Sequence, residues 1–173
     1  MTIAALCHAV LTQSDNTAAN LLLESIGGPA SITHFSRSIG DTVTRLDRIE
    51  TSLNESLAGD PRDTTSPTAI ASNLKSVLLG NVLSSASRDQ LTLWMEASLT
   101  GLERLRANLP KGWRAADKTG SNGEHTSNDI AVLWPVGKPP IIIAVYITGC
   151  IGPESKRAAM IAEIGRLVRK SLR

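Results

Sequence analysis

The sequence predicts an α+β fold in which a helical lobe is joined to part of an antiparallel sheet flanked by helices. Two observations lead to this prediction. Apolar residues recur three and four positions apart from the start of the chain to about Leu99, which is the spacing of amphipathic helices. After Gly101, short runs rich in β-branched residues alternate with Gly, Pro and Asn, which is typical of strands joined by turns. The two lobes, 1–100 and 101–173, are expected to form one domain.

The periodic segments and their flanking residues give the expected elements in order. Ser14 or Asp15 can cap the helix that follows the first one, and Pro29 suits the first turn of the next. The expected helices are the segment before Ser14, 17–26, one opened by Pro29, 67–80, 87–98 and 155–173. The expected strands are 113–119, 129–134 and 140–148.

The composition is that of an ordinary globular domain and excludes several classes of protein. The chain has 173 residues, of which 42% are hydrophobic and 20% charged. Its net charge of +2 is too weak and too scattered to indicate a nucleic acid or an anionic membrane as a partner. The longest apolar runs are strand-sized, so no membrane span is predicted. The first residues carry no basic region or cleavage site, so no signal peptide is expected.

A long stretch without helical periodicity, residues 42–66, separates the third and fourth expected helices. It carries many charges together with Gly59 and Pro61. Loops of this length inside compact domains are uncommon and are usually functional, often compact Ω-type loops. We therefore expect this long loop to hold functional residues.

Three short motifs stand out by residue type and order. S-D-N occupies Ser14–Asn16 at a helix junction, E-T-S-L-N occupies Glu50–Asn54 in the long loop, and K-T-G-S occupies Lys118–Ser121 at a strand end. Each alone has a plain structural explanation, as a helix cap, a surface carboxylate or a solvated strand end. S-D-N and K-T-G are elements of class A β-lactamases and penicillin-binding proteins, so the ordered set is far more specific than any one motif.

On these motifs the chain resembles the C-terminal two-thirds of a class A serine β-lactamase. The likeness extends to R-L-D-R-I-E at 45–50, G-D-P-R-D-T-T at 59–65 and N-D-I-A-V-L-W-P at 128–135. It implies hydrolysis of the β-lactam amide bond through a serine acyl-enzyme, with β-lactam antibiotics as substrates and no cofactor. It also implies a periplasmic or secreted protein that is a monomer when complete. The range of β-lactams accepted is not fixed by these residues.

The resemblance implies a catalytic role for several motif residues, and each residue type suits its role. Ser14 can relay a proton to the leaving nitrogen, and Lys118 beside it biases that hydroxyl. The backbone N–H of Ser121 is half of the oxyanion hole. Glu50 is the general base for the water that removes the acyl group, and Asn54 is the second ligand of that water.

Four further residues are expected to bind the substrate. Asn16 offers an amide donor to the carbonyl of the substrate side chain, and Thr119 offers a hydroxyl to the substrate carboxylate. Gly120 lets a ligand approach an edge strand closely. Arg104 lies where some subgroups supply the arginine for the substrate carboxylate, and a solvated helix-end cation is its plain alternative.

The ends of the long loop are expected to be joined. By resemblance, Arg48 and Asp63 form a salt bridge across the neck of the loop, which would position Glu50. Thr51 departs from the family, because many members carry Pro directly after the glutamate. In relatives the peptide before this position is cis, and the sequence leaves its geometry in this chain open.

The family's nucleophile, the serine of an S-x-x-K motif upstream of S-D-N, is expected to lie outside this sequence. Ser72–Lys75 matches that pattern, but it follows Glu50 in chain order and falls inside a helix rather than at a helix N-terminus. We therefore expect a partial enzyme that needs the missing N-terminal segment as a partner. Cys7 and Cys150 show no metal-ligand spacing, so no metal site is predicted, and Cys7 is expected to be a free thiol.

Two alternatives stay open. The chain could be a non-catalytic remnant that binds β-lactams or is merely structural. It could also be a relative of the penicillin-binding peptidases, which share the S-x-N and K-T-G elements. E-x-x-L-N at 50–54 disfavours the peptidase, because such an enzyme does not need a dedicated base for deacylation.

Overall fold

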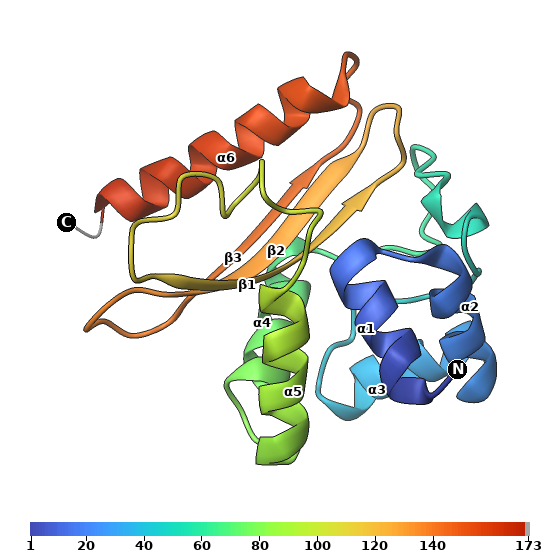
Figure 1. Ribbon diagram of the computed structural model, residues 1–173. Coiled ribbons are helices and arrows are strands. Elements are labelled where there is room, and N and C mark those ends of the chain that lie inside the picture. The colour runs from blue at the N-terminus through green and yellow to red at the C-terminus, as the bar shows by residue number, and fades with distance from the viewer. Residues whose placement is uncertain (172–173) are drawn as a thin grey trace.

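The computed structural model describes residues 1–171 and confirms the predicted α+β fold class (Figure 1). Its helices are α1 (Ile3–Gln13), α2 (Asn16–Ser25), α3 (Pro29–Ser38), α4 (Pro67–Leu78), α5 (Ser85–Glu96) and α6 (Glu154–Ser171), with a short 3₁₀ turn at Ser52–Asn54. Its strands are β1 (Arg114–Ser121), β2 (Ser127–Trp134) and β3 (Ile141–Ile147). The expected elements are confirmed, with ends shifted by up to about two residues. Residues 172 and 173, which the last helix was expected to include, lie outside the described part. The division into lobes at residue 100 stays a prediction.

The junction between α1 and α2 is fixed by two adjacent residues. Asp15 is the N-cap of α2, and its carboxylate accepts the backbone N–H of Ala18 at 2.7 Å. Ser14 ends α1 in the left-handed conformation with φ 58°. Of the two capping candidates, Asp15 therefore caps α2, and the side chain of Ser14 is left exposed at the junction.

The strands form one antiparallel sheet in the order β1-β2-β3, so β1 is an edge strand. Helix α6 covers one face of this sheet, while α4 and α5 lie on the other (Figure 1). None of the helices within residues 1–171 is both long and apolar enough to cross a membrane.

The sheet separates two apolar cores, because successive residues of a strand point to opposite faces. On β2, Leu133 packs in the core under α6, and its neighbour Val132 packs in the core over α4 and α5; both are fully buried. The α6 core contains Leu105, Ala115, Ala131, Leu133, Ile143, Val145 and Ile161. The other core contains Leu74, Leu78, Met95, Ala116 and Val132.

Two fully buried carboxyl groups fasten the segment between α5 and β1 to the sheet. Asp117 forms an ion pair with Arg106, and Asp129 accepts the backbone N–H of Leu105 at 3.0 Å. A Cβ atom at Gly101 would lie 1.8 Å from the Asp117 carboxylate, so only glycine fits there. Burial raises the pKa of Asp117, and burial together with the charge of Asp117 raises the pKa of Asp129 to about 8.

Replacing Asp129 with Asn tests this buried carboxyl. The pKa of about 8 in the folded protein lies above the unfolded value of about 3.9, so the folded state holds more protons between these values. The free energy of unfolding therefore falls as pH rises through this window. Asparagine removes the titration and keeps an oxygen that can accept the N–H of Leu105.

We expect the free energy of unfolding of Asp129→Asn, measured by urea titration at about pH 5, 6.5 and 8, to fall less steeply with pH than that of the unchanged protein. Parallel pH profiles for the two proteins would contradict the assignment.

Candidate active site

The first and third motifs meet through a hydrogen bond between side chains 104 residues apart in the chain. Lys118 Nζ on β1 donates to Ser14 Oγ at 2.9 Å, and it also donates to the carbonyl of Thr119 at 2.7 Å. A hydroxyl can accept and donate at the same time. Ser14 can thus receive the ammonium N–H while directing its own O–H at another acceptor, as a proton relay requires. Asn16 is exposed at the first position of α2, two residues further on.

The electrostatics of Lys118 connect the second motif to the same place. Burial lowers the pKa of Lys118, while the nearby carboxylates of Asp117, Glu50 and Asp129 act in the opposite direction. The second motif is also joined to the helix that follows the first motif, because Asn20 on α2 contacts the backbone of Glu50. The structure brings the three motifs together, although it does not test the roles given to their residues.

Glu50 is held in place at both its backbone and its side chain. Asn20 on α2 accepts the N–H of Glu50 at 2.8 Å and donates to the carbonyl of Glu50 at 2.9 Å. Asn54 Nδ2 donates to Glu50 Oε2 at 2.6 Å, and the Glu50–Thr51 peptide is cis. Asn20 was not among the residues predicted for the site. Its position one helical turn after Asn16, on the same face of α2, is the signal that could have found it.

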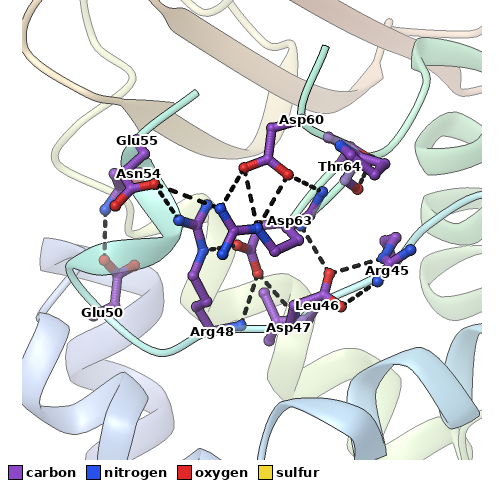
Figure 2. A network of polar contacts seen from close by, with 12 residues as sticks. Arg45, Leu46, Asp47, Arg48, Glu50, Asn54, Glu55, Asp60, Asp63 and Thr64 are labelled. Carbon is purple, nitrogen blue, oxygen red and sulfur yellow. Dashed lines mark hydrogen bonds and ion pairs between the residues drawn. The ribbon is translucent and has the colours of Figure 1, made fainter. Parts of the chain in front are cut away.

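The neck of the long loop is closed by a buried ion pair (Figure 2). Arg48 Nε lies 2.5 Å from Asp63 Oδ2, and the other oxygen of Asp63 accepts the backbone N–H of Asp47 at 2.7 Å and of Arg48 at 2.9 Å. The Asp63 side chain is only 2% exposed. Burial opposes its ionisation, but these hydrogen bonds outweigh burial and hold the pKa of Asp63 below its usual range.

The network continues around this pair to the rest of the loop (Figure 2). Arg48 also pairs with Glu55, which follows directly after Asn54, the partner of the Glu50 side chain. The neck is therefore connected to the segment that carries Glu50. Two further pairs extend the network, Arg45 with Asp47 and Arg62 with Asp60.

The end of β1 presents the residues expected to bind the substrate. The hydroxyl of Thr119 donates to Thr100 at 2.7 Å, and the hydroxyl of Ser121 donates to the carbonyl of Thr126 at 3.2 Å. Apart from the two neighbouring residues of the chain, the nearest described atom to a Cβ added at Gly120 would be Asn128 Nδ2 at 3.8 Å. Packing within the chain therefore does not require glycine here, and the role of Gly120 in admitting a ligand stays a prediction.

Arg104 has surroundings that the sequence did not suggest. Its side chain is 8% exposed and forms an ion pair with Glu154 at 2.8 Å. It also donates to the backbone carbonyls of Gly120 and Asn128 at 3.1 and 2.6 Å. The alternative of a solvated cation is therefore wrong, because the guanidinium is buried against two strands. Direct binding of a substrate carboxylate stays a prediction, and the contact with Gly120 gives Arg104 a role in positioning the end of β1.

The remaining candidates lie apart from these contacts. Ser72 lies inside α4 and not at its start, which agrees with rejecting the S-x-x-K match at Ser72–Lys75. Cys7 and Cys150 are both unpaired. Within residues 1–171, no group of three or more His, Cys, Asp or Glu side chains is arranged to hold a metal ion.

Comparison with known proteins places this arrangement in a family. The model of the beta-lactamase enzyme family matches residues 1–172. Beta-lactamase L2 of Stenotrophomonas maltophilia is 53% identical over 169 residues, which cover 96% of this chain and 55% of L2. An ancestral class A β-lactamase of known structure superimposes with a TM-score of 0.96 at 58% identity, covering 99% of this chain and 66% of that one. The chain belongs to the class A β-lactamase family.

Other members of the class A β-lactamase family match over a similar range. The carbapenem-hydrolyzing beta-lactamase KPC of Klebsiella oxytoca is 46% identical over 173 residues, which cover 99% of this chain and 59% of KPC. The chain therefore spans a little more than half the length of the curated relatives it matches. The predicted resemblance is confirmed.

The neck of the long loop yields a testable prediction. Asp63→Asn keeps the size of the side chain but removes the charge that Arg48 and two backbone N–H groups contact. Hydrogen bonds to a charged group contribute about 1.5–3 kcal/mol each. We expect amide hydrogen exchange across residues 50–60 to accelerate about tenfold or more. The matched control is Asp89→Asn, which changes an exposed carboxylate on α5. Equal acceleration of exchange in both variants, or no acceleration in either, would contradict a specific role of the Arg48–Asp63 pair.

Proposed function

We propose that this chain carries the proton-transfer and deacylation groups of a site that hydrolyses β-lactam antibiotics through a serine acyl-enzyme. The observation that supports this most is the 2.9 Å contact between Lys118 Nζ and Ser14 Oγ, with Glu50 acting on the same ammonium. A hydroxyl relay, an ammonium and a separately anchored carboxylate are the groups that acyl transfer followed by hydrolysis needs.

In the proposed acylation step, a serine of an S-x-x-K segment outside this sequence attacks the β-lactam carbonyl. The backbone N–H of Ser121 stabilises the developing oxyanion. Ser14 donates its proton to the ring nitrogen as the amide bond breaks and takes up the proton that the attacking serine releases, while the ammonium of Lys118 holds the hydroxyl in place. Arg104 keeps the end of β1 in position through the carbonyl of Gly120.

In the proposed deacylation step, Glu50 accepts a proton from a water molecule whose oxygen attacks the acyl carbonyl. The ester bond then breaks as the serine oxygen takes up the proton from Glu50. The side-chain amide of Asn54 already contacts one oxygen of Glu50, so the other oxygen can serve as the base. Asn20 and the neck of the long loop keep this carboxylate in place. Asn16 and Thr119 would contact the substrate side chain and carboxylate.

We also propose that the protein acts in the periplasm or outside the cell, where β-lactams meet their targets, and that the complete enzyme is a monomer. Cell fractionation with an antibody to the chain and size-exclusion chromatography with light scattering test the two statements. A cytoplasmic pool alone, or a stable dimer, would contradict them.

A chromogenic cephalosporin assay tests the proposed function. We expect turnover when the chain is mixed with a fragment that carries the family's S-x-x-K segment, and no turnover by the chain alone. A matched fragment with Ala in place of the nucleophilic Ser is the control. Turnover by the chain alone would contradict our account of the nucleophile. Saturable binding without turnover in every mixture would favour the non-catalytic alternative.

The proposed deacylation step yields a separate prediction, which is tested in the reconstituted enzyme. Glu50→Gln removes the base but keeps the acceptor for the Asn54 amide, so acylation should persist while deacylation slows about 100-fold or more. Asp63→Asn should slow deacylation in the same direction but less, because it only loosens the loop. Mass spectrometry after mixing with a penicillin should detect the accumulated acyl-enzyme. Unchanged deacylation in Glu50→Gln would refute the role of Glu50.

A further inference from the structure

A row of three hydroxyl groups leads from Thr119, which is expected to bind the substrate carboxylate, to a buried carboxyl group. The hydroxyl of Thr119 donates to Thr100 Oγ1 at 2.7 Å. Thr100 Oγ1 lies 3.4 Å from Ser98 Oγ, and Ser98 Oγ donates to Asp117 Oδ2 at 3.4 Å. Asp117 and Thr119 are two positions apart on β1, so both lie on one face of the strand. We call Thr119, Thr100 and Ser98 the hydroxyl chain.

The segment between α5 and β1 holds two members of the hydroxyl chain in fixed positions. The N–H of Leu99 donates to the carbonyl of Thr12 near the end of α1 at 2.9 Å. Arg106 donates to the carbonyl of Ser98 at 3.2 Å, and Ser98 is fully buried. Because the backbone is held from two sides, the hydroxyl chain can change its hydrogen bonds by rotating its O–H groups without moving the segment.

The three hydroxyl protons of the hydroxyl chain all point toward Asp117. A hydroxyl has only one proton to donate. Ser98 gives its proton to Asp117, so Thr100 is the donor in its contact with Ser98. Thr119 in turn gives its proton to Thr100. The Asp117 carboxylate at the end of the row is fully buried and paired with Arg106. The proton of Thr119 is therefore not available to a substrate in this arrangement.

A bound substrate carboxylate would compete with the buried carboxylate for these protons. A carboxylate only accepts hydrogen bonds, so Thr119 must turn its proton toward the substrate. Thr100 can then donate to Thr119 across the same 2.7 Å contact, at the expense of its 3.4 Å contact with Ser98. The longer contact is the weaker one, so this exchange favours the reversed direction once the substrate is present.

We propose that Thr100 is a positioning residue that donates a hydrogen bond to Thr119 when the carboxylate of a β-lactam is bound, and that Ser98 competes for the same proton. This inference rests on the proposed function and deepens it at the place where the substrate carboxylate binds. With Thr100 as its donor, the oxygen of Thr119 is held and its proton is directed at the substrate. While Ser98 accepts the proton of Thr100, Thr119 lacks this support.

The test uses the reconstituted enzyme with a chromogenic cephalosporin and the methyl ester of its ring carboxylate, which carries no negative charge. Thr100→Val removes the hydroxyl at nearly constant volume, and Thr100→Ser restores it. Ser98→Ala removes the competing acceptor. Thr68→Val, which changes an exposed threonine at the start of α4, is the matched control.

We expect Thr100→Val to lower the ratio of kcat/KM for the acid over the ester about threefold or more, because Thr119 loses its donor. Ser98→Ala should raise the same ratio about twofold or more, because the proton of Thr100 is then free for Thr119. Thr100→Ser and Thr68→Val should keep the ratio of the unchanged protein. A general loosening of the segment would move the ratio in the same direction in both variants, so opposite changes identify the hydroxyl chain.

The outcomes separate this inference from the proposed function. Hydrolysis with an unchanged ratio in Thr100→Val, or with an unchanged or lowered ratio in Ser98→Ala, overturns the inference alone. A lowered ratio that Thr100→Ser does not restore also overturns it, because the hydroxyl would then not be the cause. If Thr100→Val does not fold, the ratio of Ser98→Ala decides. Absence of hydrolysis in every protein overturns the proposed function, and with it the role of Thr100 that depends on it.

Discussion

The contact between Lys118 and Ser14 is the constraint on which the candidate site depends. It joins the junction of two helices to the edge strand of the sheet, so it exists only when both parts of the chain are folded and correctly placed. Ser14 ends α1 in the left-handed conformation, and its side chain accepts the hydrogen bond from Lys118. The register of β1 against β2 fixes which residue of the strand faces it. This hydrogen bond therefore depends both on the local conformation of Ser14 and on the long-range packing of the sheet.

The ion pair buried in the sheet and the ion pair at the neck of the long loop support different parts of the site. Asp117 on β1 is fully buried, where an unpaired charge would be costly, and its ion pair with Arg106 fastens the segment before the sheet. Arg48 and Asp63 instead close a loop whose outer side remains in water. The first group keeps the strand that carries Lys118 in place, and the second keeps Glu50 in place. Each catalytic candidate thus has its own charged support.

The sequence predicted the parts of the site that local patterns encode. The S-D-N junction, the long loop and the K-T-G strand end are contiguous motifs, and caps and turn residues located them. Asn20 was not predicted, because its partner Glu50 is 30 residues away in the chain and their contact depends on packing. Arg104 was predicted to lie on the segment before the first strand. Its burial against Gly120 could not be predicted, because a single cation in a turn-rich segment shows no pattern that distinguishes a buried side chain from an exposed one.

Strand β2 contributes side chains to both apolar cores, with Leu133 on one face and Val132 on the other. If either layer of helices separated from the sheet, one of these side chains would become exposed. The strand that carries both side chains would then be supported on one face only. The α6 layer and the α4–α5 layer are therefore thermodynamically coupled, and heat should disrupt them in a single cooperative transition rather than one after the other.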